Sequence, residues 1–132
     1  MVCSALYNQF NNRVEVTILG KKEEIISSFL LELRRGTVIL CVLSMLKAPT
    51  YGYSLISDLS GTGFAIEANT LYPLLRRLEG QGLLESSWNT EGAKPRKYYT
   101  TTDFGKEVLT ELTRHWESTT HSMEKILEGT NQ

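Results

Sequence analysis

The chain contains little cysteine and little proline. Its 132 residues include two cysteines, Cys3 and Cys41, and three prolines, which excludes a disulfide-stapled scaffold and a proline-rich linker. Cys41 lies in an apolar run, where a free thiol behaves as a small hydrophobic side chain. We therefore expect a reducing compartment, the cytosol.

Long hydrophobic runs are also missing. The longest apolar stretch covers residues 38–46, whereas a membrane-spanning helix needs roughly 20 apolar residues. The opening sequence, MVCSALYNQFNNR, is polar and lacks the apolar core of a secretion signal. Together these features predict a soluble protein.

Charge of either sign is not in excess. Fourteen Lys and Arg side chains against 15 Asp and Glu leave a formal net charge of -1, which excludes a histone-like polycation. A nucleic-acid partner therefore has to be argued from where the charges lie. The length suits one domain, and 41% hydrophobic and 22% charged residues are ordinary globular usage.

The first half of the chain reads as an arm followed by helices. Residues 1–20 are expected to form a weakly structured N-terminal arm, either a flexible arm or an artefact of the start site, with a short strand expected at Val14–Leu19. Residues 21–47 have helical periodicity interrupted at Gly36, which predicts two helices or one bent helix. A short helix opens at Pro49 or Thr50 and closes at Gly61.

A third helix follows over residues 69–80. Asn69 or Thr70 is expected to cap it, with Pro73 in the first turn, where proline is tolerated. Leu71, Leu74, Leu75 and Leu78 share one face. The opposite face and its flanks carry an amide, a phenol and two guanidinium groups: Asn69, Tyr72, Arg76 and Arg77.

The spacing of apolar and polar residues changes in the second half of the chain. Two segments rich in Tyr, Thr and Trp, residues 83–88 and 96–102, flank a turn at Glu91-Gly92 and predict a β-hairpin. From Thr102 to about Glu128 a long helix carries apolar side chains at a spacing of 3, 4, 3, 4, 3. This apolar stripe comprises Leu109, Leu112, Trp116, Thr119, Met123 and Ile126.

Three helices and a hairpin are the layout of a winged helix-turn-helix, a mainly α fold with a small β-hairpin. Residues 21–101 would form this DNA-binding domain, and residues 102–129 a dimerisation helix. The third helix would read the major groove, and the hairpin would reach phosphates or the minor groove. The predicted DNA contacts are Tyr51, Asn69, Thr70, Tyr72, Arg76, Arg77, Lys94, Arg96 and Lys97.

A helix that merely packs its leucines and solvates its arginines is the simpler alternative. The adjoining cations Lys94, Arg96 and Lys97 favour DNA binding. Residues 61–100 carry five basic and four acidic side chains, whereas residues 101–132 carry three and six. The acidic excess thus lies in the last helix. Tyr51 and Tyr53 are expected to pack the second helix on the core, with one hydroxyl reaching a phosphate.

At these positions the sequence resembles the PadR family of bacterial transcriptional regulators. YGY at residues 51–53, TLYP at 70–73, RRLE at 76–79 and RKYY at 96–99 carry the resemblance, which covers roughly residues 30–127. The single helix after the hairpin resembles the subgroup with a short C-terminus. Two positions depart from the family pattern: Asn69 replaces a common glycine, and Thr101 replaces a usual leucine, which should weaken packing.

The resemblance implies a homodimer, and the apolar stripe predicts one independently, because a small winged domain leaves that stripe uncovered. The alternative is packing within the same chain. The predicted interface residues are Leu109, Leu112, Trp116, Met123 and Ile126. In multidrug-binding members a tryptophan at a similar place stacks on aromatic ligands. Trp116, with His115 and Thr119, either binds such an effector or simply packs the interface.

We therefore expect a cytosolic, homodimeric DNA-binding regulator of transcription, a ligand-responsive repressor that recognises a pseudo-palindromic operator. The alternative is a protein-interaction module that dimerises without binding DNA. No catalytic constellation, cofactor loop or metal motif is present in the sequence; His115 and His121 are six residues apart and do not share a helical face.

Overall fold

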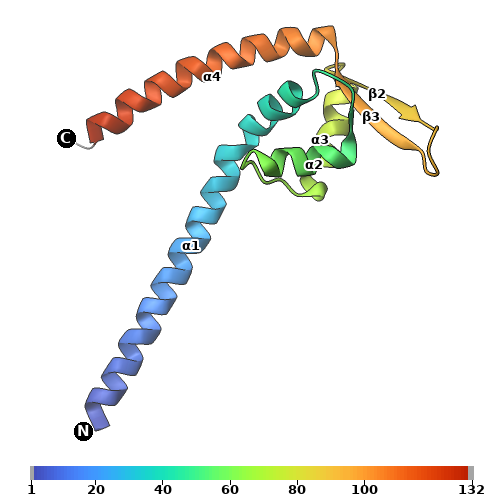
Figure 1. Ribbon diagram of the computed structural model, residues 1–132. Helices are drawn as coiled ribbons and strands as arrows, with labels where there is room; N and C mark the ends of the chain where they lie inside the picture. Colours follow the sequence, from blue (N-terminus) through green and yellow to red (C-terminus); the bar gives the residue numbers. More distant parts are fainter. Residues whose placement is uncertain (1, 131–132) are drawn as a thin grey trace. The chain divides into compact units, whose positions relative to one another are not determined.

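The structure is a computed structural model that describes the backbone of residues 2–130 and the side chains of residues 17–129. The chain divides into two compact units, residues 1–38 and 39–132. The order of elements is shown in Figure 1. Among the described residues, no helix combines the length and the apolar character that crossing a membrane requires.

The first helix, α1, spans Val2–Met45 and continues through Gly36 without a break. The strand expected at Val14–Leu19 is therefore wrong. Once a helix exists, each further residue adds a hydrogen bond without a new nucleation step, and this outweighs the β-branched character of that segment. In the first unit, Ile25, Phe29 and Leu33 are exposed hydrophobic side chains of this helix.

The second unit holds the remaining elements: β1 (Thr50–Tyr51), α2 (Gly52–Gly61), α3 (Ala68–Gly80), β2 (Leu84–Asn89), β3 (Arg96–Thr101) and α4 (Asp103–Thr130). The predicted hairpin is confirmed as β2–β3, which we call the wing. The sequence pattern missed β1, which pairs with β3 and places Thr50 opposite Tyr99 and Tyr51 opposite Tyr98. The sheet order is β1-β3-β2, and both pairings are antiparallel.

Helix α3 starts earlier than expected. Its N-cap is Glu67, not Asn69 or Thr70. Pro73 consequently lies in the second turn rather than the first, where it has no N–H to donate to the carbonyl of Asn69. Asn69 itself is exposed to solvent.

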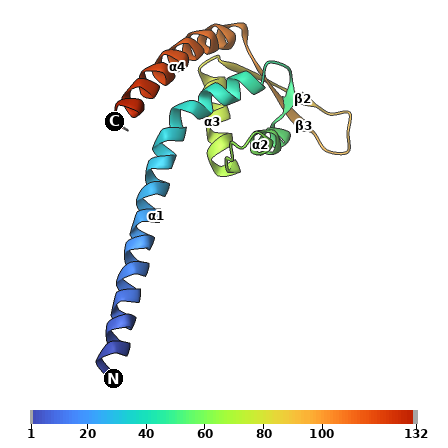
Figure 2. The same cartoon turned by 60° about the vertical axis from the view of Figure 1, so that its left-hand side comes forward.

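The end of α3 leads directly into the wing. Gly82 has a φ of 79°, a left-handed conformation that glycine adopts without steric penalty. The amide of Leu83 donates to the carbonyl of Leu78 at 2.9 Å, and that of Gly82 to Glu79 at 3.0 Å, which is a Schellman ending. This turn connects α3 to β2, and both elements are seen in the two ribbon views (Figure 2).

One apolar core joins these elements. Its members are leucines and valines that are at most 8% exposed, together with Tyr99. Leu43 comes from α1, Leu55 and Leu59 from α2, and Leu71 and Leu75 from α3. Burying each such side chain stabilises the fold by roughly 1.5–3 kcal/mol. The core thereby holds α2 and α3 beside the sheet.

The start of α4 is tied to the same core. The hydroxyl of Thr102 donates to the carbonyl of Gly82 at 2.7 Å and accepts from the amide of Gly105 at 2.9 Å, so it caps the helix at the third N–H. Leu109 is buried. From residue 113 to residue 129 every side chain is exposed except that of Thr120, which is half-buried.

Candidate nucleic-acid interface

Helix α3 presents a polar surface on the side opposite its buried leucines. Leu71, Leu75 and Leu78 are buried, and the periodicity of the helix turns the other positions outward. The outward side chains include a carboxamide, a hydroxyl and two guanidinium groups, all exposed: Asn69, Thr70, Arg76 and Arg77. Tyr72 is half-buried at the edge of this face.

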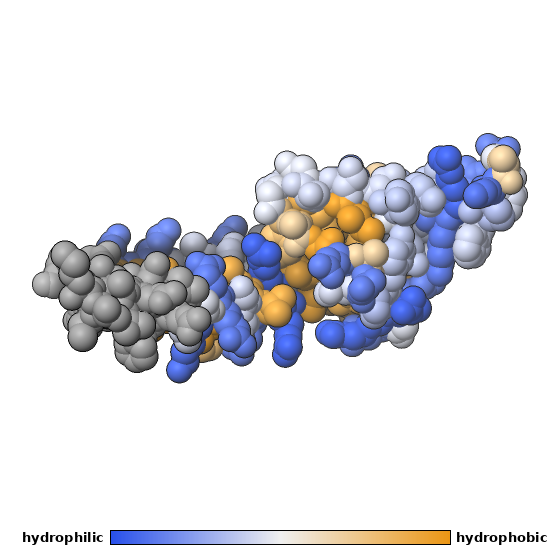
Figure 3. All heavy atoms as spheres, turned by 90° about the horizontal axis from the view of Figure 1, so that it is seen from below, coloured by the Kyte–Doolittle hydropathy of each residue, from blue (hydrophilic) through white to orange (hydrophobic). Residues whose placement is uncertain are grey.

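The cations of the wing lie in the same unit as α3, and each has a different environment. Lys94 is exposed in the loop between the strands, and Arg96 is exposed at the start of β3. Arg96 stacks on the ring of Tyr51, with its guanidinium carbon 5.2 Å from the ring centroid. The surface around the wing is largely hydrophilic in the space-filling view (Figure 3).

Lys97 is the most constrained cation of the wing. Its ammonium lies 3.7 Å from a carboxylate oxygen of Glu79 on α3. The same ammonium lies 5.2 Å from the ring centroid of Tyr99 and 5.8 Å from that of Trp88. Ser86 donates to the other oxygen of Glu79 at 2.5 Å. These contacts join the wing to α3 and hold Lys97 half-buried.

Between α2, α3 and the wing lies an open cavity of about 330 Å³. Its aromatic lining consists of Tyr51, Tyr53, Tyr72, Trp88 and Tyr99. Arg76 and Lys97 add two cationic groups. Burial raises the pKa of the Tyr72 phenol, and the phenols of Tyr51, Tyr99 and Tyr53 raise it further. This shift favours the neutral phenol of Tyr72, which can donate a hydrogen bond.

Sequence reasoning missed most of this cavity. Tyr53, expected to pack on the core, is 68% exposed and lines the cavity instead. Trp88 and Tyr99 had no assigned role. The available signal was the period of two in β3, which puts Lys97 and Tyr99 on one face of the strand. Without β1, that pattern gave no reason to bring the YGY segment alongside.

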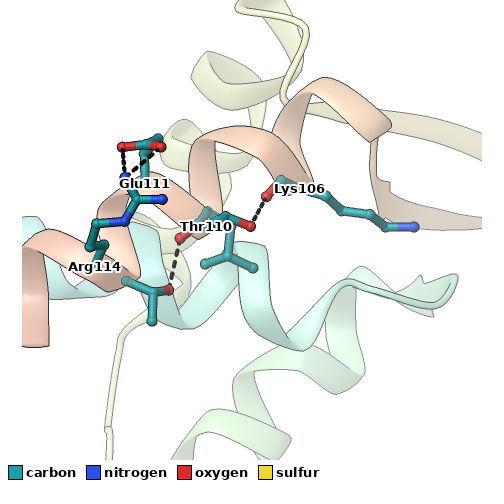
Figure 4. A network of polar contacts seen from close by, with 6 residues as sticks. Lys106, Thr110, Glu111 and Arg114 are labelled. Atoms are coloured by element: carbon teal, nitrogen blue, oxygen red, sulfur yellow. Dashed lines mark hydrogen bonds and ion pairs between the residues drawn. The ribbon is translucent and has the colours of Figure 1, made fainter.

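The residues proposed for dimerisation and ligand binding lie along α4. Leu109 is buried and Leu112 half-buried, whereas Trp116 is 48%, Met123 44% and Ile126 58% exposed. His115 and Thr119 are also exposed. Two polar contacts lie within this helix: Arg114 pairs with Glu111 at 3.1 Å, and Thr110 donates to the carbonyl of Lys106 at 3.0 Å (Figure 4).

The element order, the three-stranded sheet and the hairpin beside α3 define a winged-helix protein, which confirms the expected fold class. The model of the transcriptional regulator PadR-like family matches residues 39–111, more than half of the chain. The chain therefore belongs to the PadR-like family of transcriptional regulators. The expectation of a regulator rather than an enzyme is confirmed by this membership.

Several known proteins are similar to this chain. A PadR family transcriptional regulator from Eggerthella lenta DSM 2243 is 54% identical, with a TM-score of 0.77, over 82% of this chain and 96% of the other. Transcriptional regulator Rv3488 of Mycobacterium tuberculosis (strain ATCC 25618 / H37Rv) is 39% identical over 61 residues, 46% of this chain and 57% of the relative.

A third similar structure contains DNA. Bacillus subtilis PadR in complex with operator DNA is 27% identical, with a TM-score of 0.54. The match covers 58% of this chain and 45% of that protein. The similarity thus extends over less than half of that PadR.

Proposed function

We propose that this regulator binds double-stranded DNA sequence-specifically through α3 and the wing. The observation that carries the proposal is the exposure of Asn69 and Arg76 on the face of α3 opposite its buried leucines, and of Arg77 on the flank of that face. Asn suits adenine, and Arg suits guanine or phosphate. The operator complex of the similar Bacillus subtilis PadR supports this use of the fold.

The wing and the edge of α3 would supply contacts to the DNA backbone. Lys94, Arg96 and Lys97 are cationic, and Thr70, Tyr51 and Tyr72 carry hydroxyl groups; both kinds of side chain bind phosphate oxygens. Such contacts position the protein without reading sequence. Asn69, Arg76 and Arg77 would therefore read the base sequence. The cations of the wing would supply most of the affinity.

We further propose that the protein acts as a homodimer through α4. Trp116, Met123 and Ile126 expose apolar surface on one stripe, and a stripe at heptad spacing is buried when two helices pair. A twofold dimer presents two copies of α3 about one turn of DNA apart, roughly 34 Å. The operator would then be a pseudo-palindrome.

Repression and its relief would follow from the same arrangement. A planar aromatic effector that stacks on Trp116, near His115 and Thr119, would change the separation of the two α3 helices. A ligand shifts this equilibrium only by its difference in affinity for the two states. Effector binding would therefore lower operator affinity in proportion to that difference.

DNA flanking the gene for this chain is the first substrate to test. Labelled fragments containing an inverted repeat should bind more tightly than shuffled fragments of the same composition, measured by fluorescence anisotropy at two salt concentrations. Equal binding to both fragments would contradict sequence-specific recognition. Absence of DNA binding, with a dimer in solution, would favour the protein-interaction module instead.

A further inference from the structure

The cavity between α2, α3 and the wing combines aromatic rings with cationic side chains. Its lining is aromatic, and two of its side chains are exposed rings: Tyr53 at 68% and Trp88 at 63%. Two cations, Arg76 and Lys97, lie in the same lining. Planar rings bind planar rings by stacking, and guanidinium or ammonium groups bind anionic oxygens.

We propose that this cavity binds one nucleotide, with the base against the aromatic rings and the phosphate at Arg76 and Lys97. Stacking of bases on aromatic side chains, next to a basic surface, is the general way in which proteins hold nucleotides that are not paired. A neutral aromatic compound would form no ion pair with Arg76 or Lys97. Inorganic phosphate would form no stacking contact with the rings.

The size and floor of the cavity fit such an occupant. Its volume of about 330 Å³ lies at the lower end of the range of ligand pockets, roughly 300–1,000 Å³. Gly52 lets the ring of Tyr99 come close: a Cβ at residue 52 would lie 3.1 Å from Cε2 of Tyr99. The floor is therefore a closely packed ring that is itself buried.

The position of Lys97 is prepared before any ligand binds. Glu79 holds its ammonium at 3.7 Å, and Ser86 in turn holds Glu79. A phosphate would compete with this carboxylate for Lys97, so nucleotide binding should strengthen when Glu79 is neutralised. Glu79→Gln keeps the shape of the side chain and removes the opposing charge.

Intrinsic fluorescence tests the proposal directly. The chain has two tryptophans, so Trp116→Phe in the full chain leaves Trp88 as the only reporter. AMP should quench it saturably, adenosine should bind more weakly because it lacks the phosphate, and inorganic phosphate should not quench. Calorimetry with AMP on the unmodified chain repeats the measurement without the substitution.

Variants locate the site. Tyr53→Ala should weaken AMP binding roughly fivefold or more, the lower limit for the loss of one stacking ring. Arg114→Ala removes the same kind of charge as Arg76 but from the surface of α4, and it should leave AMP binding unchanged. AMP binding that Tyr53→Ala and Glu79→Gln both leave unaltered would overturn the proposed location.

The nucleotide has two sources, a free nucleotide or an unpaired nucleotide of a DNA strand. Quenching by AMP identifies the first. Quenching by a single-stranded thymidine oligonucleotide, with none by AMP, identifies the second. If neither compound quenches the fluorescence, the proposal is overturned.

These titrations contain no duplex, so their failure is distinct from failure of the proposed operator binding. Arg77→Ala should weaken duplex binding alone, because Arg77 lies outside the cavity lining.

Discussion

The hydroxyl of Thr101 donates a hydrogen bond of 2.8 Å to the backbone carbonyl of Leu43, 58 residues earlier in the chain. The amide of Thr101 also donates to the carbonyl of Leu46 at 2.7 Å. Thr101 is 2% exposed, so both bonds are shielded from water. The end of the wing is thereby joined to the end of α1, and the packing penalty expected for threonine here is countered by a bond that leucine cannot make.

Thr101→Val should therefore destabilise the protein. Valine keeps the shape but leaves the buried carbonyl of Leu43 without this donor, which costs about 1–3 kcal/mol. Urea unfolding followed by circular dichroism measures the loss. Thr110→Val is the matched control, because the hydroxyl of Thr110 bonds only the exposed backbone of α4; it should change stability by less than about 0.5 kcal/mol. Equal effects of the two substitutions would refute the role of Thr101.

Gly105→Ala should be more damaging than its mild chemistry suggests. An added Cβ would meet the carbonyl oxygen of Leu83 and would lie 2.7 Å from Cγ2 of Thr101. Backbone atoms cannot move aside cheaply, so we expect a loss of about 1–3 kcal/mol or more. Gly129→Ala, where nothing lies within 4 Å, should instead gain a few tenths of a kcal/mol from helix propensity. Thermal unfolding of both variants compares them, and a stable Gly105→Ala protein would contradict the packing.

Arg76→Ala should weaken binding to the native operator by about 1–3 kcal/mol if the guanidinium contacts a base, and should relax specificity at that base pair. Fluorescence anisotropy with the operator and with single-base variants measures both effects. Arg114→Ala on α4 serves as the control for loss of one positive charge. An unchanged operator affinity would remove Arg76 from the reading surface.

Lys97→Ala should weaken binding to all DNA sequences similarly and reduce the slope of log affinity against log salt by about one. The ion pair with Glu79 is partly exposed and is worth less than about 1 kcal/mol, so a phosphate can displace the carboxylate. Glu79→Gln should consequently raise DNA affinity. The check is a salt titration of both variants on one fragment, and a slope unaltered by Lys97→Ala would argue against a phosphate contact.

Ile126→Glu should convert the proposed dimer into a monomer, because a charge buried between two apolar stripes lacks a partner. Sedimentation velocity of the full chain measures the change in mass. Lys125→Glu makes a larger change in charge on the adjacent residue outside the stripe, and it should leave the dimer intact. A chain that is monomeric before any substitution would disprove the use of α4 as a dimer interface.

Local sequence patterns predict much of the fold. The hairpin between residues 84 and 101 and the long helix after Thr102 each depend on neighbours within a few residues, and periodicity or turn chemistry indicates them. The resemblance of YGY, TLYP, RRLE and RKYY to PadR regulators supplied the family. The strand prediction for Val14–Leu19 was wrong because it considered the β-branched residues of this segment without the helix that continues through them.

By itself, the sequence determined the winged-helix order and the polar face of α3, because both follow from spacing along the chain. Only the tertiary structure decided what Lys97, Tyr53 and Trp88 face. Pairing of β1 with β3 and closure of the wing on α3 bring together side chains that are far apart in sequence, and no local period encodes such pairing. The near-neutral composition is silent about this cavity, in which two cations and five aromatic rings meet.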